Sequence, residues 1–145
     1  MNNTRTLSVG IDYAQLTKEI MATLAIATAC RADEQTPALP FNRCRLNELA
    51  AIKAQAACTS LCSALGGYIA KMAGDSQSAT IDFMLPSALP ETASRLIAQR
   101  IDQYIALSVV HEFLASSPHL AAEMHKCHAD GQRALSSLRQ LLAPR

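Results

Sequence analysis

Residues 90–117, PETASRLIAQRIDQYIALSVVHEFLASS, form a long helical pattern whose polar side chains change faces halfway along. Projected at about 100° per residue, the first half has one polar and one apolar face. The polar face is Arg95, Gln99, Asp102 and Gln103, and the apolar face is Leu96, Ile97, Ile101, Tyr104 and Ile105. In the second half the former polar face carries Ala106, Val109, Val110 and Phe113, opposite Ser108, His111 and Glu112. We therefore predict a long central helix over residues 91–116.

This helix is expected to pack against one neighbour with its first turns and against another neighbour, or another subunit, with its last turns. We expect its apolar side chains to be mostly buried: Leu96, Ile97, Ile101, Ile105, Val109, Val110 and Phe113.

Two helices are predicted before the central one. The first begins at Asp12, which forms a capping-box pattern with Gln15, and runs to about Ala32. The second runs from near Leu46 to about Met72, and its middle is rich in small residues. The pair Gly66-Gly67 within it costs about 1 kcal/mol per glycine in a helix interior, which indicates a tight crossing or a bend.

The last helix follows Ser117 and Pro118, which suit the N-cap and the first helical position. An apolar seam with alternating spacings then predicts that this helix packs lengthwise against one partner. The seam is Leu120, Met124, Cys127, Gly131, Leu135, Leu138 and Leu142.

The segments outside these helices are predicted to be non-helical. Residues 1–10 are interpreted as a flexible or extended lead-in, and residues 33–45 as a proline-containing linker. Residues 80–86 suit a short extended piece. We therefore expect residues 1–145 to form a single helical domain, an all-α bundle of four main helices.

Composition limits the partners. The chain of 145 residues is 50% hydrophobic and 17% charged, which argues against disorder and leaves apolar surface for protein partners. The net charge is +1, the basic residues are scattered, and only 4% of residues are aromatic, so no nucleic-acid partner is expected. The longest apolar run, Met21–Cys30, is too short and too often interrupted to cross a membrane.

The five cysteines are Cys30, Cys44, Cys58, Cys62 and Cys127. Their number is odd, and the start MNNTRTLSVGID lacks a basic region followed by an apolar core. We interpret them as free thiols in a reducing cytosol, and we expect a cytoplasmic protein without a cofactor.

His125, Cys127 and His128 give the motif H-K-C-H, in which the two imidazoles are three residues apart and can share a helical face. A zinc site needs three or four converging ligands, and no other Cys or His pair has the spacing of a recognised metal motif. The preferred interpretation is therefore a buried thiol beside solvated histidines. A metal contact at these residues is kept as the alternative.

No catalytic residue is predicted. His111 and Glu112 begin like the metalloprotease motif H-E-x-x-H, but Ala115 stands where the second histidine is required. The chain also lacks a phosphate-binding glycine loop and a nucleophile elbow. We therefore do not expect an enzyme.

From Leu46 onward the features follow a definite order. A helix of small residues, AACTSLCSALGGYIAKM, is followed by a Leu-Pro loop, DFMLPSALP, and by the long apolar helix. A polar turn, ASSP, and the last amphipathic helix, HLAAEMHKCHADGQRALSSLRQLL, complete the chain. This layout resembles small bacteriophage head–tail connector proteins, the head-completion or neck adaptors of tailed phages and Mu-like prophages. The N-terminal half departs from that pattern, because Tyr13 is followed by an additional apolar helix and a linker.

The resemblance implies an α-helical subunit that forms a ring between portal and tail, self-associates, binds a portal or tail protein and has no catalytic role. A connector would be part of the virion. The alternative is a small cytosolic helical module for protein–protein interaction or regulation. An enzyme or metal protein is the third hypothesis.

Overall fold

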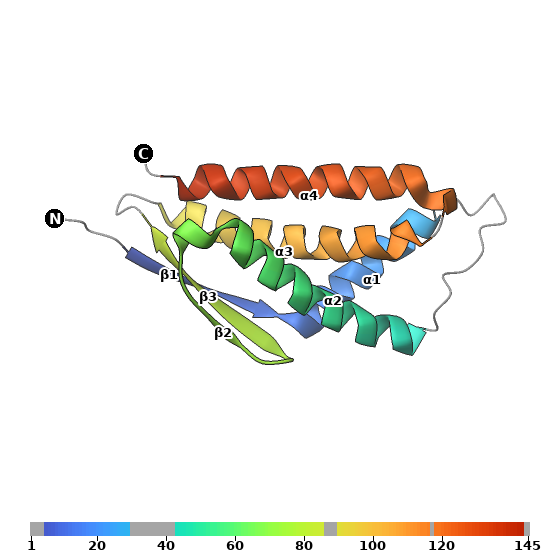
Figure 1. The fold of residues 1–145 in the computed structure, drawn as a ribbon, viewed down its shortest axis with the longest axis horizontal. Helices are drawn as coiled ribbons and strands as arrows, with labels where there is room; N and C mark the ends of the chain where they lie inside the picture. The colour runs from blue at the N-terminus through green and yellow to red at the C-terminus, as the bar shows by residue number, and fades with distance from the viewer. Residues whose placement is uncertain (1–4, 30–42, 86–89, 117, 144–145) are drawn as a thin grey trace.

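The computed structural model describes residues 5–29, 43–85, 90–116 and 118–143 (Figure 1). The elements are β1 Arg5–Asp12, α1 Tyr13–Ala29, α2 Arg43–Ala64, β2 Ile69–Gly74, β3 Ser78–Leu85, α3 Glu91–Ala115 and α4 Ala121–Leu142. Short 3-10 turns at Gly66–Tyr68 and Pro118–Leu120 follow α2 and precede α4. The prediction of an all-α bundle is therefore wrong, because four helices are combined with a three-stranded antiparallel sheet.

The strand order is β1-β3-β2. The N-terminal strand β1 therefore pairs with β3, the second strand of the β2–β3 hairpin. β1 keeps one register with β3 from Arg5 opposite Leu85 to Asp12 opposite Ser78. The predicted lead-in at residues 1–10 is thus part of a strand from Arg5 onward. The alternation in TLSVGID explains this, because one face points into the core and the other into solvent.

The predicted second helix is also too long. α2 ends at Ala64, and the residues expected to be its last turns form the 3-10 turn and β2. The helix ends before the pair Gly66-Gly67, because glycine loses more backbone conformational entropy in a helix than any other residue. A Cβ added to either glycine would meet no described atom within 4 Å, so these residues do not form a tight helix crossing.

The other helix boundaries lie close to the predictions. Asp12 caps α1, and its Oδ1 accepts hydrogen bonds from the backbone N–H groups of Ala14 and Gln15 at 3.0 and 3.4 Å. The predicted end of this helix at Ala32 and most of the predicted linker, residues 33–45, lie outside the described residues. Residues 43–45 belong to the first turn of α2.

The central position of α3 is confirmed. α3 contacts α1, α2, α4 and β1, so both of its apolar faces are buried within one chain. Six of the seven residues predicted to be buried are buried, and Leu96 is half-buried. The seam of α4 faces α3 as expected, with Met124 only partly buried.

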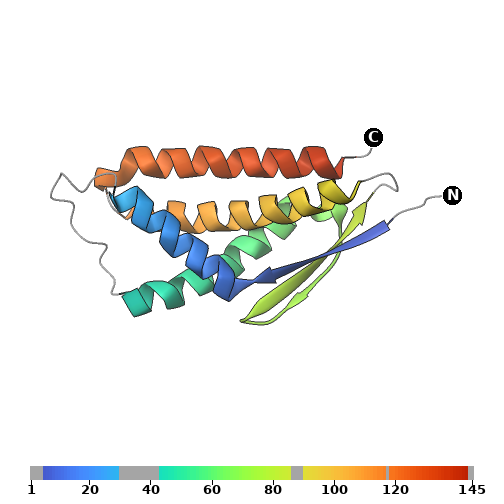
Figure 2. The ribbon, with the colours of Figure 1, turned by 180° about the vertical axis from the view of Figure 1, so that it is seen from behind.

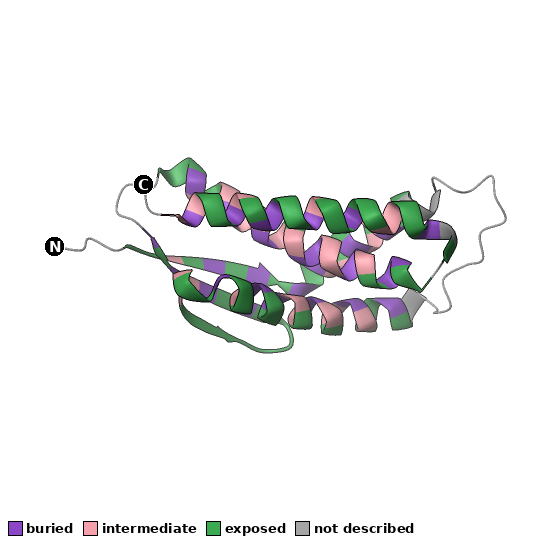
Figure 3. Ribbon diagram, turned by 45° about the horizontal axis from the view of Figure 1, so that its top comes forward, coloured by how far each residue is buried: buried purple, intermediate pink, exposed green. Residues whose placement is uncertain are grey.

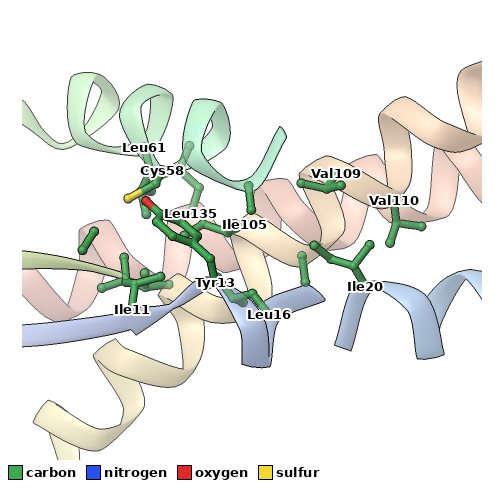
Figure 4. Packing of buried hydrophobic residues seen from close by; sticks show 14 of the residues in the cluster. Ile11, Tyr13, Leu16, Ile20, Cys58, Leu61, Ile105, Val109, Val110 and Leu135 are labelled. Carbon is green, nitrogen blue, oxygen red and sulfur yellow. The ribbon is translucent and has the colours of Figure 1, made fainter. Parts of the chain in front are cut away.

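The elements form layers that Figures 1 and 2 show from opposite sides. α4 lies along the outside of α3, and α1, α2 and the sheet lie on the other side of α3. Figure 3 shows alternating buried and exposed bands on α4, and Figure 4 shows core side chains from α1, α2 and α3 meeting around Tyr13. In the described part of the chain, no helix combines the length and apolarity that a membrane span requires.

Candidate functional site

The H-K-C-H motif does not converge on one point. Cys127 is buried, whereas His125 and His128 are exposed. Among the described residues, no group of three or more His, Cys, Asp or Glu side chains is arranged to hold a metal ion. His128 instead lies beside His111 of α3, with ring centroids 5.1 Å apart.

Glu112 forms an ion pair with Lys53 of α2. Its Oε2 accepts a hydrogen bond from Lys53 Nζ of α2 at 3.1 Å. The same Nζ lies 5.9 Å from the centroid of the Phe113 ring. This ion pair is partly exposed and joins α2 to the end of α3, so its role is structural.

Cys58 and Cys62 lie one turn apart on α2, next to Tyr13 (Figure 4). Burial raises the pKa of Cys58, and burial together with Cys58 raises the pKa of Cys62 to about 11. Burial also raises the pKa of Tyr13. Thiols in this state are protonated at neutral pH and are poor nucleophiles. The geometry agrees with the interpretation of these two cysteines as core residues.

An acidic cleft of about 470 Å³ lies between α1, α3 and α4. It is lined by Glu19, Ala22, Thr23, Gln99, Asp102, Gln103, Ala106, Leu107 and Asp130. Burial, and secondarily the charge of Glu19, raises the pKa of Asp102 to about 6. Asp130 is bound by Arg133 at 3.1 Å.

A carboxyl that titrates near neutral pH can exchange protons. The described residues that line this cleft, however, include no histidine, cysteine or lysine to act with Asp102. The cleft therefore holds one carboxyl group with a raised pKa, beside the carboxylates of Glu19 and Asp130.

The two outer strands of the sheet form a further candidate surface. Within the described residues, β1 and β2 each pair only with β3, so their outer edges have backbone N–H and C=O groups without a strand partner. The edges lie on opposite sides of the molecule, with β2 nearer the viewer in Figure 1 and β1 nearer the viewer in Figure 2.

The two edges differ in how well they are protected against pairing with an added strand. β2 has a register shift between Ile69 and Lys71, and a bulge and an edge lysine both discourage pairing. Every residue of β2 from Ala70 to Gly74 is exposed (Figure 3). β1 is eight residues long and regular, without lysine, proline or a register shift. The edge of β1 is therefore the better template for an added strand.

Comparisons of the chain with protein-family models, curated proteins and solved structures found no match. The function of the chain is therefore inferred from its own residues.

Neither the two sheet edges nor the His111–His128 pair was predicted from the sequence. The alternation in β1 was a usable signal, but eight residues of alternation do not reveal a distant partner strand. The two histidines are separated by a helix–helix turn, so no local spacing indicates that their rings meet.

Proposed function

We propose that the protein is a non-catalytic structural protein that self-associates through the outer edge of β1. The observation that supports this is the regular edge of β1, which pairs with no second strand among the described residues. A ring subunit needs two different surfaces, one for each neighbour, and a strand edge supplies backbone hydrogen bonds for one of these contacts.

A head–tail connector of a tailed phage or Mu-like prophage is the particular form that we propose, with a portal or tail protein as the further partner. The order of the small-residue helix, the long apolar helix and the last amphipathic helix supports it. The helix of small residues is shorter than in that layout and ends at Ala64, because Ile69–Gly74 form β2. The α-helical fold that the resemblance implied is not found, because Asp82–Leu85, expected to lie in the Leu-Pro loop, belong to β3. The proposal therefore keeps the assembly role and abandons the all-α subunit.

Light scattering on a sizing column across a range of protein concentrations tests self-association. We expect a defined oligomer, or a monomer that assembles as concentration rises. Thr6→Lys and Gly10→Lys, at two exposed positions of β1, should lower the fraction of oligomer, because edge lysines oppose strand addition. No described atom lies within 4 Å of a Cβ added at Gly10, so this position accommodates a side chain.

Thr80→Lys is the matched control. Thr80 is exposed and lies opposite Gly10 in the register, but it belongs to the central strand β3. It should leave the mass unchanged. A strict monomer at every concentration would reject assembly through this edge. The same conclusion would follow if Thr80→Lys lowered the fraction of oligomer as much as Thr6→Lys and Gly10→Lys do.

The second candidate function is a monomeric interaction or regulatory module. It is favoured by the burial of both apolar faces of α3 within one chain, because that helix then needs no second subunit. A strict monomer that binds a different protein would support this function.

A further inference from the structure

His111 and His128 come together across two antiparallel helices, α3 and α4. Their ring centroids are 5.1 Å apart and the ring planes are inclined at 42°, so the rings do not form a parallel stack. His128 is exposed and His111 is partly buried, so an ion from solvent reaches the pair from the His128 side.

The register of the two helices supports this pairing. A Cβ added at Gly131, one turn beyond His128, would lie 3.7 Å from Leu107 Cβ, one turn before His111. Further along, Arg100 Nε donates a hydrogen bond to Ser137 Oγ at 3.3 Å. These contacts hold α3 and α4 side by side, so the separation of the histidines is set by helix packing.

The separation fits shared coordination. Imidazole nitrogens bind Zn²⁺ at about 2.0–2.1 Å in tetrahedral geometry, which places two ligating rings with centroids about 5 Å apart. Imidazole is a preferred ligand of Zn²⁺ and of the neighbouring late transition metals.

We propose that His111 and His128 bind one divalent transition-metal ion of the zinc class across the α3–α4 pair. Structural and catalytic zinc sites have three or four protein ligands. The His111–His128 pair supplies two, and no third His, Cys, Asp or Glu among the described residues joins it, so this is an open surface site that holds the ion more weakly. Water occupies the other coordination positions. Glu112 stays with Lys53, at 3.1 Å, and does not contribute.

Titration calorimetry with Zn²⁺ alone, on the full chain without an affinity tag, tests the site. We expect wild-type protein to bind one more Zn²⁺ per chain than His111→Phe or His128→Phe. Phenylalanine keeps an aromatic ring at each position and removes the nitrogens, so it separates metal binding from ring packing. Melting temperatures measured without metal show whether each variant is folded.

His125→Ala is the matched control, because His125 is an exposed histidine on the same helix as His128. It should retain the wild-type Zn²⁺ stoichiometry, and its affinity should change less than about tenfold. The proposal is wrong if folded His111→Phe binds as much Zn²⁺ as wild type. It is also wrong if His125→Ala loses the ion as completely as His128→Phe does.

Discussion

Gly74 of β2 lies directly opposite Ala79 of β3, and a Cβ added at Gly74 would be 2.7 Å from the Cα of Ala79. Real Cβ atoms do not approach backbone so closely, so only glycine fits at this position of the hairpin.

Gly74→Ala should therefore destabilise the fold by about 1–3 kcal/mol through overpacking. Gly67→Ala is the control, because a Cβ there meets no described atom within 4 Å. Urea unfolding monitored by circular dichroism gives the free energy of unfolding of each variant. Equal stability of the two variants would contradict the steric argument.

Replacing Asp102 should stabilise the protein at neutral pH. The pKa of Asp102 is raised from 3.8 to about 6 by burial and by Glu19, so the folded state holds the proton more tightly than the unfolded state. The stability that the protonated Asp102 gives to the folded state is fully present below pH 3.8 and is lost as the pH rises through about 6. Asp102→Asn should gain about 1–2 kcal/mol above that range, after allowing for solvent screening, and nothing at low pH.

Urea unfolding at several pH values checks this dependence. Glu19→Gln should lower the pKa of Asp102, because Glu19 is the secondary cause of its shift. In the Glu19→Gln variant, Asp102→Asn should therefore stabilise the fold less at neutral pH than it does in the wild type. A gain for Asp102→Asn that is the same at every pH would show that proton linkage is not the reason.

The two isoleucines Ile101 and Ile52 should respond differently to truncation. Ile101 is completely buried in α3, whereas Ile52 on α2 is 62% exposed. Ile101→Ala should cost about 2–5 kcal/mol, and Ile52→Ala should change stability by less than about 0.5 kcal/mol. Thermal melting compares them directly, and an unchanged melting temperature for Ile101→Ala would remove that residue from the core.

Acid should loosen the turn between β2 and β3. Asp75 Oδ1 accepts hydrogen bonds from the backbone N–H groups of Gln77 and Ser78 at 2.8 and 2.9 Å, and these bonds lower the pKa of Asp75. The stability they give is present at neutral pH and is lost as the carboxylate is protonated. Amide hydrogen exchange in the hairpin should therefore quicken in acid, relative to its intrinsic rate, and Asp75→Ala should show this faster exchange already at neutral pH.

Ser76→Ala is the control for this turn. It changes the exposed side chain next to Asp75 and leaves both hydrogen bonds of Asp75 in place. Slow exchange in Asp75→Ala at neutral pH would mean that the cross-strand ladder alone holds the hairpin.

The helices were largely predictable because their signals are local. The Asp12 cap and the seam that ends at Leu142 each depend on spacings within a few turns. The two faces of α3 could be recognised in the same way, since each is a stripe along one helix. What the sequence left open was whether a second subunit covers the later face, and within this chain both faces are buried.

The sheet was missed because strand pairing is not local. β1 and β3 are far apart in sequence, and short alternation without a visible partner resembles an extended lead-in. β2 was assigned to the second helix because Tyr68 and Met72 continue the helical spacing of Leu61 and Leu65. The contact of His111 with His128 was missed for the same reason, because it depends on how two helices pack side by side.

The pairing of β1 with β3 also has a kinetic consequence. The β2–β3 hairpin closes through a short turn, whereas β1 must wait until both helices and the hairpin that follow it have been synthesised. Closing so long a loop is entropically costly, and folds that depend on distant contacts form slowly. During synthesis the first strand would therefore remain an open, alternating segment, and it is the part of the chain that a chaperone would have most reason to shield.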